Sequence, residues 1–273
     1  MLLTLIRVII TSILLSSSAI SLSQNFSSTF LQYSYGWNND DYINGANPSN
    51  GKMNLITLDH LNVTQWGGFY GFVNYMIAPD EFYLIGFHNK TIDSNNGRYR
   101  LYSEIAPWIS IPNLLGKKLD NKIIKDVSLE TQLNIGVNFF AGLVGIGFTF
   151  NTPPDRSFKI STYWRRDNIR ENTMQFTGVF DFPISKKLGL KAQGYFDLIP
   201  YAKNRSEYGS TILGTDFVSQ IRFLYDAGRH TLFKNDTNTK LDIGVDVYMH
   251  FNKDMATHNV YTFVPQPCIR LSF

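Results

Sequence analysis

The most constraining feature of this chain is a strictly alternating segment near its C-terminal end. Every second residue from Leu241 to Phe251 is large and apolar. The intervening residues are Asp242, Gly244, Asp246, Tyr248 and His250. Because successive side chains of a β-strand point to opposite faces, the segment predicts a strand with one apolar and one ionisable face. Such a strand fits a soluble sandwich with its polar face in water, or a membrane barrel with its polar face in the lumen.

Strand length separates these two architectures. Several alternating segments run for 10 to 14 residues, whereas strands of soluble proteins average about 5–6 residues and tilted membrane strands need roughly 9–11. An even number of strands also places both termini on the periplasmic side. We therefore predict an all-β fold, a single transmembrane antiparallel β-barrel of about 12 strands. The predicted strand cores lie near residues 29–37, 53–61, 68–78, 98–110, 127–135, 140–150, 157–166, 173–182, 188–198, 215–225, 240–251 and 260–273.

The N-terminal segment indicates the cellular compartment. Arg7 is the only charged residue among the first 39, and a short apolar run follows it at 8–15. Small residues at Ser21 and Ser23 then suit signal-peptide cleavage before Gln24. We expect a signal peptide at 1–23 and one outer-membrane barrel domain at 24–273, although a buried N-terminal helix is the alternative for the first segment.

Several function classes find no support in the sequence. No later stretch approaches the roughly 20 apolar residues of a membrane helix, so a membrane form must be a closed barrel. The net charge of +3 comes without a basic run, which argues against nucleic-acid binding. The single Cys268 excludes an internal disulfide.

Catalysis and metal binding are not indicated either. Histidine and cysteine show no metal-ligand spacing, and no glycine-rich phosphate loop is present. The nearest acid–histidine pairs, Asp59 with His60 and Asp226 with His230, are interpreted as structural or lumen hydrogen-bond pairs. We expect no enzyme, no metal and no cofactor.

The connections partly follow the pattern of long outer loops and short periplasmic turns. The expected outer loops are 38–51, 79–97 and 199–214, and the expected tight turns are 62–67, 151–156 and 183–187. Three connections break the pattern: 112–126 and 227–239 are long for periplasmic turns, and 136–139 is short for an outer loop.

Stretches along nearly the whole mature chain, taken in order, resemble the Tsx family of nucleoside-specific outer-membrane channels. Each stretch alone is a weak match, and the resemblance rests on their occurring together in the same order as in the family. They are Leu55-Ile56-Thr57-Leu58-Asp59-His60, Trp66–Asn74, Tyr102–Pro107, Leu115–Leu119, Lys125–Val127, Tyr163–Asn168, Phe217–Gln220, the alternating segment 241–251, and Val264-Pro265-Gln266 before the final Phe273.

The resemblance implies a twelve-stranded barrel with a narrow pore that passes nucleosides and deoxynucleosides by passive diffusion. The chain departs from the family at Asp59, where Glu is common, and at Asn74, where an acidic residue is common. Pro267 adds a second proline beside Pro265 in the last strand. Because proline donates no ladder hydrogen bond, we expect regular pairing of that strand to begin only around Cys268.

The inferred faces select candidate pore-lining residues. The ionisable and aromatic residues chosen are Arg100, Tyr102, Glu104, Tyr163, Arg165, Asp181, Arg222, Asp246 and Tyr248; Lys191, Tyr195 and Asp197 share the inward face. Tyrosine faces can stack on a base, and carboxylates can accept hydrogen bonds from sugar hydroxyls. The alternative for each residue is a solvated lumen position without ligand preference.

We therefore predict a passive, nucleoside-preferring channel in the bacterial outer membrane. Its expected partners are nucleosides, outer-membrane lipid and, through a terminal strand ending in the aromatic Phe273, the barrel assembly machinery. Two rivals remain: a non-selective, structural or receptor barrel, and a barrel enzyme.

Overall fold

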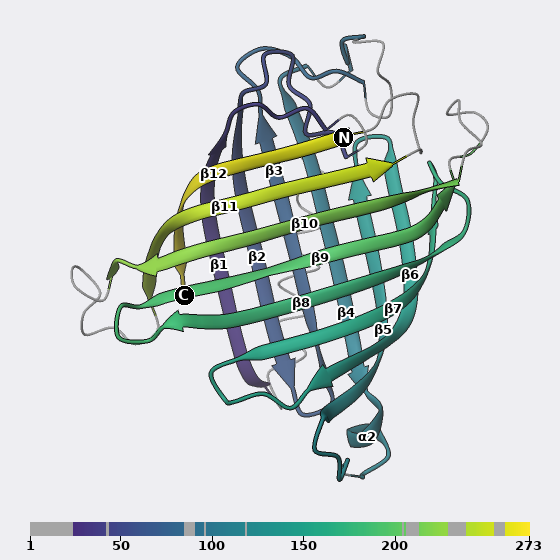
Figure 1. The fold of residues 1–273 in the computed structure, drawn as a ribbon, viewed down its shortest axis with the longest axis vertical. Helices are drawn as coiled ribbons and strands as arrows, with labels where there is room; N and C mark the ends of the chain where they lie inside the picture. The colour runs from purple at the N-terminus through teal and green to yellow at the C-terminus, as the bar shows by residue number, and fades with distance from the viewer. Residues whose placement is uncertain are drawn as a thin grey trace.

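The protein folds as one closed antiparallel barrel (Figure 1). The computed structural model describes residues 24–41, 44–84, 91–95, 97–117, 119–203, 205, 213–228, 239–253 and 260–273. Each strand pairs with its neighbours in the sequence, and β12 closes the barrel against β1. The strands are β1 (Gln24–Gly36), β2 (Met53–Thr64), β3 (Gly67–Ile77), β4 (Tyr99–Ser110), β5 (Ile124–Gly136), β6 (Phe139–Phe150), β7 (Ser157–Asp167), β8 (Thr173–Ser185), β9 (Leu190–Lys203), β10 (Leu213–Asp226), β11 (Lys240–Lys253) and β12 (Val260–Ser272). The predicted twelve-stranded all-β barrel is confirmed.

Each predicted strand core overlaps one observed strand, and the differences lie at the ends. Arg98 precedes β4, and Leu188 lies in the turn before β9. β9 also runs further than expected, through Pro200 to Lys203. The pairing of β9 with β10 shifts register opposite this proline, and such a bulge is where a strand tolerates one. The predicted signal peptide at 1–23 lies outside the described residues.

The faces of the barrel are inverted relative to a soluble protein. On β11 the side chains of Ile243, Val245 and Phe251 are 45%, 39% and 36% exposed, whereas Asp246 and His250 are fully buried. The other strands repeat this arrangement, with apolar residues outward and polar residues inward. An apolar outer wall around a polar interior is the arrangement that lipid requires, and closure leaves no backbone edge unpaired. The chain is therefore an outer-membrane barrel of the bacterial type.

A short helix that the sequence did not predict, α2 (Ile111–Leu114), lies between β4 and β5, at the end of the barrel where β1 begins and β12 ends. Ser110 caps it by accepting from the backbone amide of Asn113. The helix lies past the ends of the strands, at the bottom of the view (Figure 1). In the described ranges no helix is long and apolar enough to cross a membrane. At the opposite end, the tight turn between β5 and β6 depends on Asn138, whose φ of 54° is in the left-handed region that Asn tolerates.

The two prolines of β12 lie at the seam that closes the barrel. β12 pairs with β11 along its whole length, including Pro265 and Pro267, but pairs with β1 only from Cys268 to Ser272. The backbone nitrogens of residues two positions apart in a strand, such as Pro265 and Pro267, face the same neighbouring strand. Both prolines therefore direct the nitrogen that lacks a hydrogen towards β1, with which this part of β12 does not pair. The expectation that pairing starts near Cys268 is correct for β1 and wrong for β11.

The seam ends at the last residue. The backbone amide and carbonyl of Phe273 exchange hydrogen bonds of 3.0 and 2.9 Å with Thr29. The phenyl ring is 55% exposed. A role for Phe273 in assembly remains a prediction.

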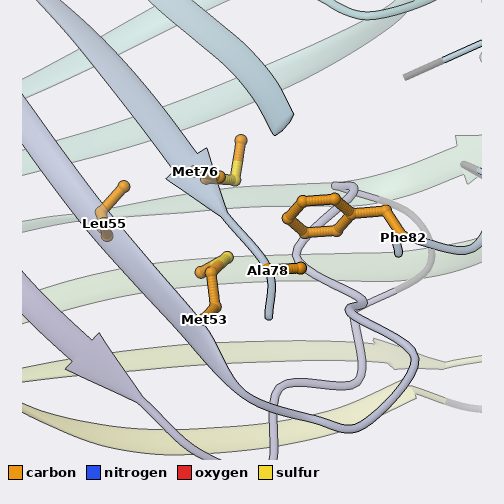
Figure 2. Packing of buried hydrophobic residues seen from close by; sticks show 5 residues of the cluster. All are labelled: Met53, Leu55, Met76, Ala78 and Phe82. Atoms are coloured by element: carbon orange, nitrogen blue, oxygen red, sulfur yellow. The ribbon is translucent and has the colours of Figure 1, made fainter. Parts of the chain in front are cut away.

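A small apolar cluster fixes the outer mouth (Figure 2). Met53, Leu55 and Met76 project inward from β2 and β3, and the loop after β3 brings Ala78 and Phe82 against them. Phe82 is fully buried, and the guanidinium carbon of Arg100 lies 4.6 Å from the centre of its ring. The loop after β3 thus packs inside the mouth.

Candidate functional site

The loop between β1 and β2, residues 38–51 and hereafter loop 1, is tied to the inner wall of the barrel. The carboxylate of Asp41 lies 2.9 Å from Nδ1 of His250 and accepts a hydrogen bond from the hydroxyl of Tyr248. Burial alone would raise the pKa of Asp41. The charge of His250, together with hydrogen bonds from His250, the Asn44 amide and Tyr248, outweighs burial and lowers that pKa below its usual value.

Arg100, on β4, binds both loop 1 and the loop after β3. Its guanidinium donates to the Gly45 carbonyl at 2.5 Å and to Oδ1 of Asn47 at 2.6 Å, both in loop 1. It also donates to the Tyr83 carbonyl and pairs with Asp93 at 3.2 Å, both in the loop after β3. Arg100 is 2% exposed. One buried cation therefore joins two outer loops to β4.

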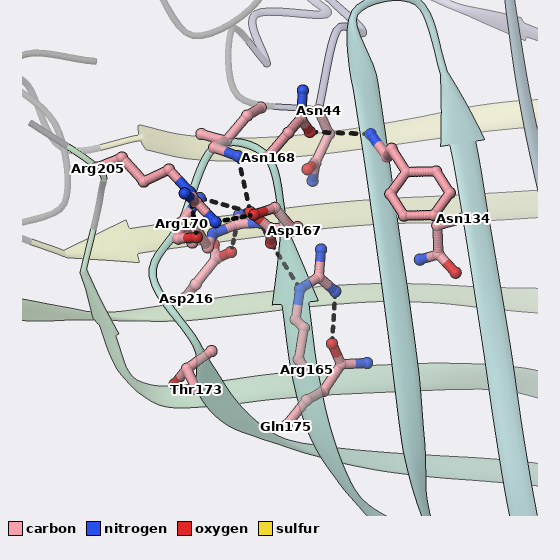
Figure 3. A network of polar contacts seen from close by, with 12 residues as sticks. Asn44, Asn134, Arg165, Asp167, Asn168, Arg170, Thr173, Gln175, Arg205 and Asp216 are labelled. Carbon is pink, nitrogen blue, oxygen red and sulfur yellow. Dashed lines mark hydrogen bonds and ion pairs between the residues drawn. The ribbon is translucent and has the colours of Figure 1, made fainter. Parts of the chain in front are cut away.

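A chain of alternating charges continues around the wall (Figure 3). Asp167 accepts from Arg165 at 2.8 Å and from Arg170 at 3.3 Å. Arg170 also pairs with Asp216, whose other oxygen lies 2.5 Å from Nε2 of His250. Since His250 reaches Asp41, the chain connects the end of β7 with loop 1.

Further ion pairs lie along the inner wall of the barrel. Arg222 pairs with Asp246 at 3.1 Å, and Lys191 pairs with Asp242 at 3.2 Å. Glu130 pairs with Lys159. Glu130 further accepts from three hydroxyl groups, those of Ser128 at 2.5 Å, Ser161 at 2.8 Å and Tyr163 at 2.5 Å.

A cavity of about 130 Å³ lies beneath loop 1. Its aromatic wall is continuous across β3, β4 and β6, because the ring centres of Phe72 and Tyr102 are 5.9 Å apart and those of Tyr102 and Phe139 are 6.3 Å apart. Tyr195 and Tyr248 complete the aromatic lining from β9 and β11.

Two carboxylates in the cavity accept hydrogen bonds from neutral donors. Glu104 accepts from Tyr102, from Gln132 at 3.0 Å and from Asn134 at 3.1 Å. Asp197 accepts from the hydroxyl of Thr177 at 2.5 Å. In the described part of the chain, neither forms an ion pair. The cavity thus combines aromatic faces with acceptors whose donors are neutral.

All nine predicted site residues lie on inward faces of the barrel. Five of them line the cavity: Arg100, Tyr102, Glu104, Arg165 and Tyr248. The other four, Tyr163, Asp181, Arg222 and Asp246, lie elsewhere along the lumen. Ion pairing or hydrogen bonding already engages three of those four, whereas Asp181 is exposed to the lumen.

The prediction missed part of the cavity. Phe72 and Phe139 were not selected, although the inward register of β3 and β6 places both in the lining. Asp197 and Tyr195 were placed on the inward face but not among the site residues. Alternation alone gives the face of a residue, not its height along the lumen.

Of the two acid–histidine pairs, only Asp59 with His60 lies within the described residues. Asp59 and His60 are consecutive in β2 and point to opposite faces, and Nδ1 of His60 lies 2.9 Å from the hydroxyl of Thr29. His230 lies outside the described residues. Within the described ranges, no group of three or more His, Cys, Asp or Glu side chains is placed to hold a metal ion.

Comparison with known proteins gives structural matches alone. No protein-family model and no curated protein sequence matches the chain. The KdgM porin aligns with a TM-score of 0.46 and 11% identity over 90% of this chain and 98% of its own. The KdgM porin in complex with disordered oligogalacturonate gives 0.44 and 10% over 91% and 98%. CdiB from Acinetobacter baumannii gives 0.31 and 11% over 90% and 60%. At these levels of similarity the matches identify neither a family nor a permeant.

Proposed function

We propose that the protein is a passive diffusion channel of the outer membrane whose cavity recognises nucleosides. The observation that carries the proposal is the aromatic wall of Phe72, Tyr102 and Phe139 beside the acceptors of Glu104 and Asp197. The resemblance of ordered sequence stretches to nucleoside-specific channels supports the same ligand class.

A nucleoside offers groups that complement both parts of this cavity. Its base is flat, and stacking of a base on an aromatic side chain contributes about 1–3 kcal/mol in single-strand binders. Its sugar hydroxyls are donors, and carboxylate and amide oxygens can accept from them. Such interactions are individually weak, and a channel needs weak sites because a tightly bound solute does not leave.

The surroundings of the cavity make it a constriction. Loop 1 is held inside the mouth through Asp41 and Arg100, and ion pairs occupy the adjacent wall. A solute that enters must therefore pass close to the aromatic wall. This geometry favours recognition over free passage.

Current block in a planar bilayer tests the proposal. Adenosine titrated to millimolar concentration, the range of weak sites, should reduce the ion current through the unmodified protein. Tyr102→Ala removes one stacking face and should weaken the block about 5- to 150-fold, the equivalent of about 1–3 kcal/mol. Tyr102→Phe keeps the ring and should retain most of the block.

Tyr33 supplies the control, because its side chain is 44% exposed on the outer wall. Tyr33→Ala should leave the block unchanged. If millimolar adenosine has no effect on the current of the unmodified protein, the nucleoside proposal is wrong and a non-selective or structural barrel takes its place.

A further inference from the structure

The charges around the cavity do not balance. Six charged residues line it, namely Arg100, Glu104, Arg165, Arg170, Asp197 and Asp216. Arg100 is paired with Asp93. Arg165, Arg170 and Asp216 belong to the alternating chain that ends at His250 and Asp41, in which each cation contacts a carboxylate. With His250 protonated between its two carboxylates, this chain is neutral. Glu104 and Asp197 remain as excess negative charge.

An additional acceptor faces the same space. Gln266 lines the cavity and is 2% exposed, and its amide oxygen has no hydrogen-bond partner among the described residues. Buried polar atoms without partners are uncommon, and each needs an explanation. The guanidinium of Arg165, by contrast, is engaged by Asp167 and by Gln175 at 2.6 Å. Two donors of the lining, Nε of Arg100 and Nε of Arg170, also lack a hydrogen-bond partner among the described residues, but each guanidinium is already paired with a carboxylate. The lining groups without a charged partner in the described residues are therefore the acceptors Glu104, Asp197 and Gln266.

We infer that the cavity selects solutes that carry a positive charge, in the first place a primary ammonium group, over neutral and anionic solutes of the same shape. The inference rests on the proposed function in one respect, that the cavity lies on the permeation path. A primary ammonium offers three donors and a charge, which matches Glu104, Asp197 and the Gln266 oxygen.

Two further effects act in the same direction. Charge of one sign on the low-dielectric walls of a narrow passage focuses the field and concentrates ions of the opposite sign. The aromatic faces of Phe72, Tyr102 and Tyr195 also attract cations through their quadrupoles. An anion meets repulsion at the same place. The cavity is therefore a cation-preferring segment of the lumen.

A matched series of three probes tests the inference. Adenosine, 5′-amino-5′-deoxyadenosine and adenosine 5′-monophosphate share base and sugar and differ in charge. The measurements are made at pH 8, where a primary amine is protonated and the carboxyl groups of aspartate and glutamate are ordinarily ionised. We expect the amine to block the ion current of the full-length channel at a concentration at least tenfold lower than adenosine, and the phosphate to block least.

An isosteric double variant tests whether Glu104 and Asp197 cause the preference for the amine. In the variant that carries both Glu104→Gln and Asp197→Asn, the blocking concentrations of the amine and adenosine should lie within about twofold of each other. Glu171→Gln provides the matched control, because Glu171 lies on the outer loop after β7 with its side chain 51% exposed. That control should keep the full preference for the amine.

The reversal potential in a KCl gradient gives a second, ligand-free measurement. We expect K⁺ to permeate more readily than Cl⁻ in the unmodified channel, and the double variant to lose that preference. Equal block by adenosine and the amine, or stronger block by the phosphate, would overturn the inference and leave the nucleoside proposal standing. If none of the three probes blocks the current, the nucleoside proposal fails. In that case equal K⁺ and Cl⁻ permeability would overturn the charge inference as well, and a cation preference that the double variant loses would support it.

Discussion

Asp41→Asn should release the inner half of loop 1 from the barrel wall and raise the conductance of the channel. Asp41 is fully buried, contacts His250 at 2.9 Å and receives the Tyr248 hydroxyl. Asparagine has the same shape but no charge. The substitution therefore leaves His250 facing a neutral amide while Arg100 still holds Gly45 and Asn47.

The size of the effect follows from burial. Removing one partner of a buried ion pair costs about 3–5 kcal/mol. The amide oxygen of asparagine still accepts hydrogen bonds, so we take the lower end, about 3 kcal/mol. At about 1.4 kcal/mol per tenfold change, the docked arrangement of loop 1 loses about a factor of 100 relative to undocked ones. Single-channel recordings should show a larger mean conductance and frequent transitions between levels.

Asp40→Asn is the matched control, because it removes the same charge from the neighbouring residue, which is exposed. It should leave conductance and noise unchanged. Equal behaviour of the two variants would refute the assignment of Asp41 as the tether.

The pH dependence of the conductance gives a further check on the same tether. The pKa of Asp41 in the folded protein lies below its usual value, because the effect of burial is outweighed by the charge of His250 and the hydrogen bonds to the carboxylate. Its contribution to docking is therefore complete above about pH 4 and is lost only as the pH falls through the lower, folded pKa. The unmodified channel should therefore show no increase in transitions between conductance levels from pH 7 to about pH 4, and such an increase between pH 7 and 5 would contradict the assignment of Asp41 as the tether.

Two substitutions test the barrel wall itself. Val245→Arg puts a charge on the lipid face near the middle of β11 and should destabilise the barrel by about 2–4 kcal/mol. The loss is measured as a lower urea midpoint of unfolding in detergent or lipid, and the control Val245→Leu should leave the midpoint unchanged. Equal midpoints for the two variants would show that the lipid and lumen faces are assigned the wrong way round. Gly147→Ala should destabilise by about 1–3 kcal/mol because its added Cβ would lie 1.9 Å from Oε1 of Glu130, and Gly142→Ala, which meets nothing within 4 Å, serves as its control. Unchanged stability of Gly147→Ala would show that Glu130 can vacate its place without loss.

The faces of the strands could be predicted from the sequence because they follow from alternation within one segment. Leu129 and Ile135 are exposed and Glu130 and Asn134 are buried, as the pattern in β5 indicates. Strand number and length were predictable for the same reason. The ends of the strands were harder to predict, because the residue at which a strand stops depends on the neighbouring strand. β9 continues to Lys203 because β10 pairs with it there.

The charge pairing inside the lumen could not be predicted in this way. Asp41 and His250 are in contact although they are 209 positions apart in the sequence. Arg170 contacts Asp216 although β8 and β9 lie between them in the sequence. A list of inward residues shows both signs of charge and therefore suggests a mixed lumen. Only the cross-strand registers reveal which charges neutralise one another.

This distinction between paired and unpaired carboxylates bears directly on function. Burial of an ionised group is unfavourable unless it is paired, and Glu130 and Asp246 satisfy that condition. In the part of the chain that the structure describes, Glu104 and Asp197 have only neutral donors, and both line the cavity under loop 1. Local departures from favourable pairing are expected at functional sites, where a ligand rather than the protein supplies the missing partner. The position of these two carboxylates beside an aromatic wall is therefore better explained by a passing solute than by the stability of the barrel.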